Sequence, residues 1–507
     1  MRRTALALAA CLGTVFLSCA RPAPLEGTYT ISVPYDLDTL DPAARNRLSD
    51  FSLLSNLYEP LVVTDANLSP RPALAVRWSN PDTLTWVFEL RTGVRFHDGQ
   101  PLTAEDVVWS FERLRTSPGL EMSGHVSAIR TVRARDEKTV EIRTEAPVGI
   151  LLNKLRFILV VRRGEDFPVL SGRVNGTGPY RMAAWDRGVS LTLQRNGDYW
   201  GARPALGRVR FSLNRSPAAA LEDFVAGRSL FVQSNSKATE EALRGRTGVE
   251  LRRNSSVSVK FLYFDVSRET SADVAGGRNP FRDVRVRRAV SLAVDRDELV
   301  RRLSVPAAPA SQLVTPYIFG YDPSRKPIRY DPRAAARLLA EAGWPDGFAV
   351  RFPARGLFAE GAGLVAEMLG RVGIRARVVP LAEPEWFRAM AERSFSMTLS
   401  RFGCPTGDAS DLFENLLQSH DPEKKAGLAN YTRYSSPEVD RQVSLAAQTL
   451  EMTRRKAMLL EATGEAMEDL PVVPLYIDQD LYAFRSGVEW KPRNDNFLIA
   501  SEIALPR

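Results

Sequence analysis

The chain has 507 residues, of which 44% are hydrophobic and 25% are charged, and its formal net charge at pH 7 is +8. These proportions are typical of globular proteins. A single hydrophobic core stops growing near about 250–300 residues, so the length predicts more than one domain. The basic excess is spread along the chain, without the Lys/Arg runs and interleaved aromatics that track nucleic acid, so we expect no nucleic-acid partner.

The N-terminal segment predicts export from the cytoplasm. Arg2 and Arg3 precede an apolar run over residues 5–17 that is too short to span a bilayer, and a small residue and Cys19 follow it. This layout is typical of a signal peptide over residues 1–18, and the position of Cys19 resembles a bacterial lipobox. We therefore expect lipidation at Cys19, a tether over residues 19–27 and a periplasmic protein anchored to the membrane. The alternative is an ordinary signal peptide cut beyond Ala20, which leaves a soluble periplasmic protein.

The first elements after the tether are a strand, a hairpin and a helix. Bulky apolar residues alternate over residues 84–90, which predicts a half-buried strand. Residues 94–96 are expected to pair with it as a hairpin closed by the turn dipeptide at residues 98–99. A hydroxyl and a carboxylate three positions apart, Thr103 and Asp106, predict a helix N-terminus with a capping box.

The rest of the chain mixes strands and helices. Alternation predicts strands at residues 189–193, 209–213 and 260–266, and the polar stretch 267–279 is expected to be a loop. Apolar residues at helical spacing predict a helix over 283–302. Asp331 and Pro332 form a predicted N-cap, and Gly343 ends the helix that follows. We therefore expect an α/β fold with several sheets.

Motifs for catalysis, metal binding and cofactor binding are absent from the sequence. The three histidines, His97, His125 and His420, have no neighbours at ligand spacing, and there is no nucleophile elbow or phosphate-binding loop. We expect a binding protein without cofactor, metal or catalytic activity. A secreted hydrolase is the rival from another class, and only these three histidines could serve as its base.

Several segments, in order, resemble the family 5 extracellular solute-binding proteins of ABC importers, the peptide- and nickel-binding group. The resemblance covers residues 29–484. The matching segments are the helix ending in Leu57-Tyr-Glu-Pro-Leu61, the stretch from Pro72 to Trp78, residues 87–113, Gly176-Thr-Gly-Pro-Tyr180, residues 196–201, 279–300, 338–343, 434–440 and 470–476.

The resemblance implies a two-lobed periplasmic binding protein fold, type II with the extra domain of the peptide-binding group, and a ligand cleft between the lobes. Lobe 1 would combine domain I (residues 28–48, 172–262 and 470–507) with domain II (49–171), and lobe 2 would be domain III (263–469). The hinge is expected near 263–266 and 474–478. The implied partners are a peptide or peptide-like solute and the permease and ATPase of an importer, and the protein is expected to be a monomer.

The resemblance also places a binding segment at residues 402–409. In peptide-binding relatives, a segment resembling W-x-x-D-x-x-D-P enters the cleft, and its first Asp pairs with the α-ammonium group of the peptide. Here the aromatic position is Phe402, the second Asp is Asp408, and the ammonium-pairing position is Pro405, which has no charge. A buried ammonium without a counter-charge costs several kcal/mol. Either Asp408 or Asp411 replaces the missing carboxylate, or the ligand is not a conventional free-amine peptide.

The candidate ligand-binding residues are therefore Arg401, Phe402, Gly403, Cys404, Asp408, Asp411, Ser49 and Asp50. Ser49 and Asp50 correspond to positions that contact the ligand main chain in relatives, and Arg401 could face an anionic ligand. Trp386 and Phe387 are weaker candidates, Cys404 also fits a small buried hydrophobe, and His97 fits a structural role. The alternative functions are a receptor for a nickel chelate, haem or an oligosaccharide, and a periplasmic chaperone or sensor that has lost transport.

Overall fold

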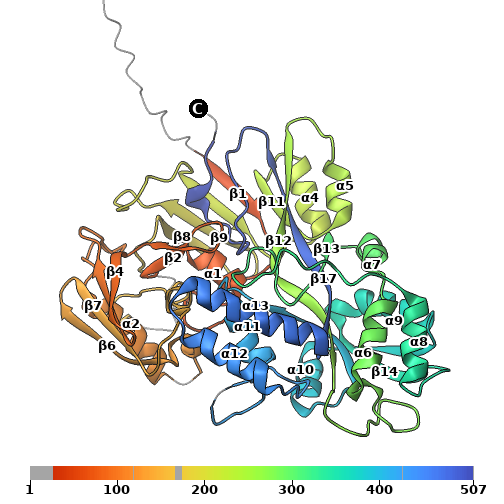
Figure 1. Cartoon of the computed structure of the whole chain (residues 1–507). Helices are drawn as coiled ribbons and strands as arrows, with labels where there is room; N and C mark the ends of the chain where they lie inside the picture. The colour runs from red at the N-terminus through yellow and green to blue at the C-terminus, as the bar shows by residue number, and fades with distance from the viewer. Residues whose placement is uncertain (1–26, 118, 166–173, 425, 506–507) are drawn as a thin grey trace, which may run out of the picture.

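The computed structural model describes residues 27–117, 119–165, 174–424 and 426–505. The predicted signal peptide, Cys19 and the tether up to residue 26 lie outside these ranges. Within them, the strands form one large sheet, a four-stranded sheet and a two-stranded ribbon, with helices packed around them (Figure 1). No helix in the described part of the chain combines the length and the apolar character that crossing a membrane requires.

The large sheet runs through the whole molecule, with strands from distant parts of the sequence side by side. Its order is β15 (Ile374–Leu381), β14 (Phe348–Arg355), β16 (Met397–Gly403), β12 (Val249–Phe264), β17 (Val472–Arg485), β11 (Phe231–Ser234), β1 (Thr28–Ser32), β10 (Arg208–Ser212), β9 (Ser190–Arg195) and β8 (Tyr180–Asp186), and β13 (Ala307–Pro309) pairs with β17.

The long strands β12 and β17 cross the centre of this sheet and belong to both of its halves. The C-terminal half of β17 pairs with β11, and the C-terminal half of β12 pairs with β16. Between these halves the register of β12 against β17 shifts between Ser255 and Val259. Such an irregularity interrupts the ladder and bends the strand. The two halves of the sheet therefore meet at residues 255–259 and at the facing residues 477–479.

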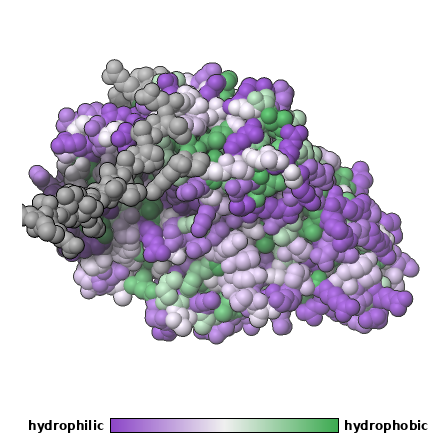
Figure 2. All heavy atoms as spheres, turned by 90° about the horizontal axis from the view of Figure 1, so that it is seen from above, coloured by the Kyte–Doolittle hydropathy of each residue, from purple (hydrophilic) through white to green (hydrophobic). Residues whose placement is uncertain are grey.

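Each half of the sheet has its own hydrophobic core, which defines two lobes. The core of lobe 1 contains residues from β1, β5, β10 and the C-terminal end of β17. The core of lobe 2 begins at Val257 and ends at Ile477, and it also contains Leu68 from the N-terminal part of the chain. Residues 257–262 and 470–477, which the sequence assigns to domain I, thus pack in the core of lobe 2. Hydrophilic side chains cover most of the face seen in Figure 2, and apolar side chains form smaller patches there.

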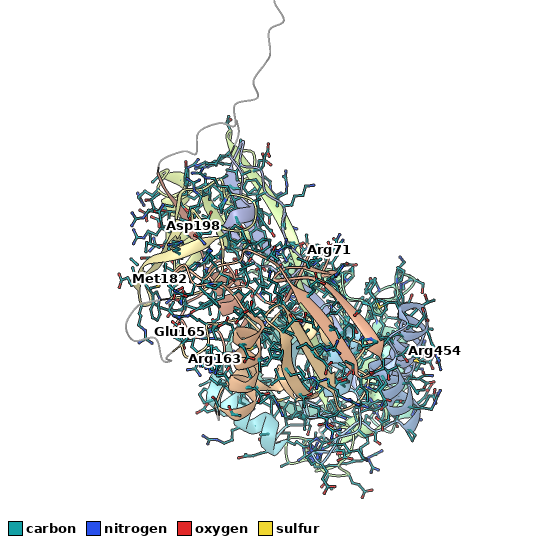
Figure 3. All side chains as sticks on the ribbon, turned by 90° about the vertical axis from the view of Figure 1, so that its left-hand side faces the viewer. Arg71, Arg163, Glu165, Met182, Asp198 and Arg454 are labelled. Carbon is teal, nitrogen blue, oxygen red and sulfur yellow. The ribbon has the colours of Figure 1, made fainter. Side chains whose placement is uncertain are left out.

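Lobe 1 carries an additional small sheet, which faces the viewer in Figure 3. Its order is β4 (Ala75–Asp82), β5 (Thr85–Leu90), β7 (Thr139–Thr144) and β6 (Ile129–Asp136), and the ribbon beside it consists of β2 (Val62–Thr64) and β3 (Pro70–Pro72). Trp86 and Phe88 of β5 stack with ring centroids 6.4 Å apart. Both residues pack into the core of lobe 1, so this sheet and the lobe-1 half of the large sheet share one core.

The helices divide between the two lobes. Lobe 1 has α1 (Leu48–Leu54), α2 (Ala104–Thr116), α3 (Leu151–Leu155), α4 (Pro217–Val225) and α5 (Lys237–Leu243). Lobe 2 has α6 (Val284–Ala293), α7 (Arg296–Arg302), α8 (Pro332–Glu341), α9 (Ala359–Gly370), α10 (Glu383–Glu392), α11 (Ala409–Leu416), α12 (Pro437–Gln448) and α13 (Met452–Asp469). In Figure 1, α11, α12 and α13 lie between the small sheet and the remaining helices of lobe 2.

Local sequence signals fix most of these boundaries. The predicted capping box is confirmed, because Thr103 and Asp106 at the start of α2 bond each other reciprocally. The predicted strands at 84–90, 189–193, 209–213 and 260–266 correspond to β5, β9, β10 and the end of β12. The predicted hairpin with residues 94–96 is wrong, because β5 pairs with β4 and β7 instead. The predicted helix over 283–302 is divided into α6 and α7, because Asp295 caps a new helix by accepting a hydrogen bond from the backbone N–H of Glu298.

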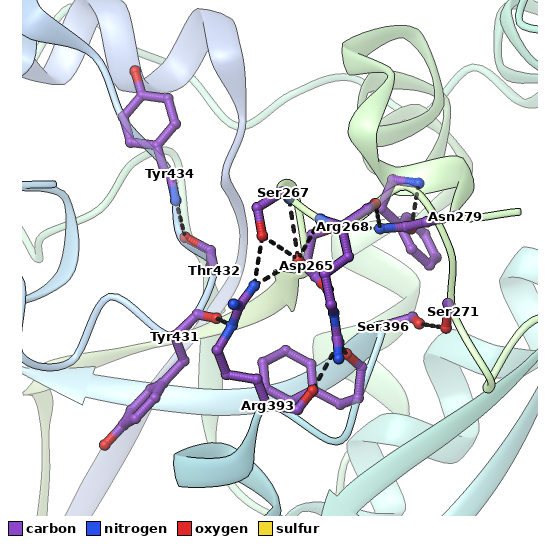
Figure 4. A network of polar contacts seen from close by, with 12 residues as sticks. Asp265, Ser267, Arg268, Ser271, Asn279, Arg393, Ser396, Tyr431, Thr432 and Tyr434 are labelled. Carbon is purple, nitrogen blue, oxygen red and sulfur yellow. Dashed lines mark hydrogen bonds and ion pairs between the residues drawn. The ribbon is translucent and has the colours of Figure 1, made fainter. Parts of the chain in front are cut away.

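The chain that leaves β12 is fixed to lobe 2 by a polar network (Figure 4). Asp265 is fully buried and accepts hydrogen bonds from Arg268, Ser267 and Arg393, whose Nη2 lies 2.9 Å from Oδ1. These donors hold the pKa of Asp265 below its usual value despite burial. The backbone N–H of Val266 also donates to the carbonyl of Thr432, 3.2 Å away. The segment 263–266, where the sequence predicts a hinge, is therefore held by lobe 2 at its C-terminal end.

Candidate ligand-binding cleft

A cleft of about 640 Å³ lies where the two lobes meet. Most of its lining comes from the loop and helix around α1, the bulge of β12 at residues 256–258, the end of β16 at residues 401–405, and β17 at residues 478–480. The rest of the lining consists of Tyr35, Gln233, Asn235, Val305, Pro306, Asp495 and Asn496. Ligand sites are typically concave, a few hundred to about 1,000 Å³ in volume, and located between domains. The cleft has this size and position, and residues of both lobes can reach one bound molecule.

The wall from lobe 1 is polar. Ser49 and Ser52 of α1 line the cleft together with Tyr35, whose hydroxyl group lies 3.3 Å from Ser52 Oγ. Asp50 is only 2% exposed and does not line the cleft. Its carboxylate lies 3.0 Å from Arg47 Nη2, and burial raises its pKa even though Arg47 opposes the shift. Of the two predicted residues of α1, the structure thus brings only Ser49 to the cleft.

The wall from lobe 2 is the C-terminal end of β16. Arg401, Phe402 and Gly403 line the cleft, as does Pro405. Gly403 pairs with Ser258 of β12, and a β-carbon at this position would lie 2.8 Å from Ser258 Oγ. The glycine thus lets β16 lie close against the bulge of β12. Three of the sequence-predicted residues of the binding segment therefore face the space between the lobes.

Cys404 lies in the same segment and points away from the cleft. Its side chain is fully buried, its thiol donates to the carbonyl of Asp408 over 2.7 Å, and burial raises the pKa of the thiol. Thiol reactivity requires the thiolate, which burial disfavours. Of the two readings of Cys404, its surroundings fit the small buried hydrophobe.

Neither acidic candidate of the binding segment lines the cleft. Asp408 is 3% exposed, caps α11 and forms an ion pair with Arg455. It lies beside a second cavity of about 410 Å³ between the small-sheet side of lobe 1 and lobe 2. Asp411 accepts a hydrogen bond from Thr406 Oγ1 over 3.3 Å, and burial raises its pKa. The structure therefore does not place either carboxylate where Pro405 contacts the cleft.

Three acidic residues that were not among the predicted ones line the cleft: Asp478 and Asp480 of β17, and Asp495, which is paired with Arg493. Asp478 forms an ion pair with Lys260, whose side chain is 2% exposed. Asp480 accepts a hydrogen bond from Asn496 Nδ2, and burial, together with Asp478, raises its pKa to about 7. The sequence signal was two aspartates at i and i+2 in an otherwise apolar strand, a spacing that puts both on one face.

Arg401 is the cleft-lining cation whose side chain forms no hydrogen bond and no ion pair with the described residues. Asp478 and Glu383 act on it only as more distant charges. Desolvation and the nearby guanidinium of Arg355 lower its pKa, whereas Arg355 itself pairs with Glu383. Arg47, the cation on the opposite wall, is already paired with Asp38 and Asp50. Arg401 is therefore the group best placed to bind an anion.

The weaker candidates lie outside the cleft. Trp386 is buried, and its indole N–H donates to Thr398 Oγ1 over 3.4 Å, whereas Phe387 is 52% exposed. His97 accepts a hydrogen bond from the N–H of Gly176 through Nδ1, and its Nε2 donates to the carbonyl of Gly178. Burial lowers the pKa of His97 to about 4, so the ring is neutral and ties two loops together. This is the structural role that the sequence suggested.

Beyond the cleft, the lobes also touch at the second cavity. Asn153 Nδ2 donates to the carbonyl of Thr406 over 2.7 Å, and the N–H of Gly149 donates to the carbonyl of Ala447 over 2.8 Å. Leu68 is inserted into the core of lobe 2 and is 3% exposed.

Within the described ranges, no group of three or more His, Cys, Asp or Glu side chains could hold a metal ion.

Two lobes with separate cores, a sheet that continues through two crossing strands, and a cleft at the crossing define the class of two-lobed binding proteins. The model of the bacterial extracellular solute-binding proteins, family 5, matches residues 69–423. The chain belongs to this family, the solute-binding proteins of ABC importers, as the sequence motifs predicted.

Individual relatives agree with this assignment. The glutathione-binding protein GsiB of Salmonella choleraesuis (strain SC-B67) is 25% identical over 498 residues, which cover 93% of each chain. The structure of HbpA2 from Haemophilus parasuis matches with a TM-score of 0.82 at 20% identity, over 95% of this chain and 100% of that one. DppA from Helicobacter pylori, in complex with the peptide STSA, matches with a TM-score of 0.77 at 21% identity, over 95% and 98%. The predicted two-lobed α/β fold is thereby confirmed.

Proposed function

We propose that this protein is the extracytoplasmic receptor of an ABC importer, which captures a peptide or peptide-like solute between its lobes and delivers it to the permease. The observation that carries the proposal is the cleft of about 640 Å³, to which both lobes and both crossing strands contribute polar side chains. The relatives support it, because one is named for glutathione and another was solved with the peptide STSA.

Closing of the lobes would make the receptor state depend on the ligand. A solute that contacts both walls binds the closed arrangement more tightly than the open one, and only this difference in affinity can shift the equilibrium. The bulge at residues 255–259 interrupts the strand that joins the lobes, so it is a suitable place for the movement. The permease would then recognise the closed form.

The proposal includes the domain division and the anchor. The division implied by the sequence assigns residues 28–48, 172–262 and 470–507 to domain I, 49–171 to domain II and 263–469 to domain III. Because 257–262 and 470–477 pack in the core of lobe 2, domain I would end at residue 256 and resume at residue 478. A lipid on Cys19 would keep the receptor near its permease at the periplasmic face of the membrane. In this case Cys19→Ala releases the protein into the soluble periplasmic fraction, and unchanged membrane association of this variant rules out the anchor.

The decisive experiment is native mass spectrometry of the receptor purified from its own periplasm, followed by denaturation and identification of the released molecules. Released peptides support the proposal, and loss of their uptake on deletion of the cognate permease gene establishes the transport role. Recovery of the same peptides unchanged after prolonged incubation with the receptor is expected, because the proposal includes no catalysis. Cleaved peptides would contradict that part of it.

A second candidate is a receptor of the same fold for a non-peptide anion. Pro405 favours it, because this position supplies no counter-charge to an amine, and so does Arg401, because its guanidinium has no partner among the described residues. A single released species without peptide bonds, identified in the same experiment, would establish this candidate in place of the first.

A further inference from the structure

Two charged side chains of the cleft have no ion-pair partner among the described residues. They are Asp480 on β17 and Arg401 on β16, and both line the same space. The other charged groups of the cleft are paired, since Asp478 contacts Lys260 and Asp495 contacts Arg493. A charge that is partly desolvated and unpaired is costly unless a ligand brings the opposite charge. The pair therefore describes the charge pattern of a solute that would complement the cleft.

Asp480 is held in place on the lobe-1 side of the sheet crossing. It pairs in register with Asn254 of β12, and Asn496 Nδ2 donates to its Oδ2. One carboxylate oxygen thus has a neutral donor, and no described cation forms an ion pair with the group, since the nearby Lys260 is paired with Asp478. Gln233 and Asn235, which line the cleft beside it, are neutral as well. An ammonium group entering the cleft would supply the ion-pair partner that the described side chains do not.

Arg401 is held on the lobe-2 side. It pairs in register with Lys260 at the edge between β16 and β12, and its residue is exposed to the cleft. The two neighbouring side chains Lys260 and Arg355 are cations themselves. They repel the guanidinium of Arg401 and do not neutralise it. A carboxylate fits the planar guanidinium through two parallel hydrogen bonds. The guanidinium N–H groups of Arg401 donate to none of the described residues, so they can bind such a carboxylate.

Building on the proposed function, we propose that the solute is a zwitterionic peptide whose ammonium group pairs with Asp480 and whose carboxylate pairs with Arg401. Because the two residues lie on opposite sides of the crossing between the lobes, one peptide that reaches both contributes more binding energy to the closed arrangement. The ammonium partner has then moved from the segment around Pro405 to β17. Neither Asp408 nor Asp411 has to take over the role.

The test uses the full-length receptor, freed of bound solute by partial unfolding and refolding, and three libraries of di- to pentapeptides. The first library has free termini, the second is N-acetylated and the third is C-amidated. Retained peptides are identified by native mass spectrometry, and their affinities are measured by calorimetry. The variants are Asp480→Asn and Arg401→Met. The matched controls are Asp297→Asn and Arg337→Met, which make the same changes at exposed helix positions outside the cleft.

We expect the wild type to retain free peptides and to discriminate against both blocked libraries. Asp480→Asn should bind free peptides roughly 30-fold or more weakly and should no longer distinguish them from acetylated ones. Arg401→Met should instead lose the discrimination against amidated peptides. Both controls should behave like the wild type.

Two results would overturn the inference in distinguishable ways. If the wild type retains free peptides and Asp480→Asn keeps the same preference for a free amine, the assignment of Asp480 is wrong while the proposed function stands. If the wild type retains no peptide from any library, the peptide-receptor function itself fails, and the inference fails with it.

Discussion

The carboxylate of Asp408 lies 2.6 Å from Nη2 of Arg455, and both side chains are almost completely buried. Arg455 also donates to Ser410 Oγ and to the carbonyl of Ala446. The ion pair thus joins the start of α11 to α12 and α13. A carboxylate committed in this way is not available to a ligand, which explains why the most obvious replacement for the charge missing at Pro405 is a structural residue.

Asp408→Asn should destabilise the protein strongly, because it leaves the guanidinium of Arg455 buried without a counter-charge. Breaking a buried pair from one side costs about 3–5 kcal/mol. Urea denaturation at pH 7, at constant ligand content, measures the change. Asp411→Asn is the matched comparison, since the Asp411 carboxylate accepts a hydrogen bond from Thr406 and forms no ion pair with the described residues, and it should cost less than about 1.5 kcal/mol. Equal losses of unfolding free energy in the two variants would show that the ion pair with Arg455 contributes no more to stability than the hydrogen bond of Asp411.

Much of the fold follows from local sequence signals. The reciprocal bonding of Thr103 and Asp106 and the N-cap of Asp331 depend on residues three positions apart, so they can be recognised without knowledge of the tertiary structure. The alternating strands are visible for the same reason. The division of the predicted helix at Asp295 is a local signal too, but the apolar spacing continues across it and conceals the break.

The cleft was predicted only in part, because its residues come together through tertiary packing. Arg401, Phe402 and Gly403 were found through the motif that surrounds them. Asp480 belongs to a strand paired with residues more than two hundred positions away, and no local pattern shows that the nearby Lys260 pairs with Asp478 instead. Conversely, the burial of Asp50 and the pairing of Asp408 depend on partners that spacing does not reveal.

Asp480→Asn should stabilise the ligand-free protein at pH 8 but not at pH 4. Burial and Asp478 raise the pKa of Asp480 from 3.8 to about 7, so the folded state binds this proton more tightly than the unfolded state. The ionised carboxylate therefore destabilises the fold above pH 7, and this cost disappears as the pH falls toward 4. We expect a gain of about 2–4 kcal/mol at pH 8, measured as denaturation midpoints at both pH values. An identical gain in stability at pH 4 would mean that ionisation of the Asp480 carboxyl does not cause the effect.

The raised pKa of Asp480 also predicts that peptide affinity depends on pH. Below pH 7 Asp480 is protonated in the empty cleft, and an ammonium group would have to displace that proton. Affinity for a free-amine peptide should therefore fall about fivefold between pH 7 and pH 6, where the α-amino group of the peptide stays protonated, with proton release on binding. Calorimetry in two buffers of different ionisation enthalpy measures both effects. The charged and titratable groups that face Asp480 are Asp478, Lys260, Tyr35, Tyr482 and, beside Asn496, Asp495.

The variant Asp480→Asn separates this carboxyl from its neighbours, because it removes one titrating group and leaves the others in place. Its affinity should be low and should not change between pH 6 and pH 7. If the variant keeps the fivefold dependence, a neighbouring group such as Lys260 is responsible instead.

The contact between Leu68 and Gly407 is the part of the structure that best explains how the lobes hold together away from the cleft. Leu68 belongs to the turn between β2 and β3 and has a backbone φ of 66°, which is unusual for leucine, yet its side chain packs in the core of lobe 2. A β-carbon on Gly407 would lie 2.7 Å from Leu68 Cβ. Leu68 can occupy this place only because residue 407 has no side chain.

Gly407→Ala should therefore separate the lobes at this contact. The new methyl group must displace Leu68 or the loop that carries it, which should lower peptide affinity several-fold and increase the radius of gyration of the ligand-free protein in small-angle scattering. Gly93→Ala is the matched control, because Gly93 has the same φ of +77° but nothing within 4 Å of the added carbon. In both variants the new alanine must adopt a left-handed backbone conformation, which costs about 1–2 kcal/mol. Only Gly407→Ala should change scattering and affinity, and equal behaviour of the two would show that Leu68 does not hold the lobes together.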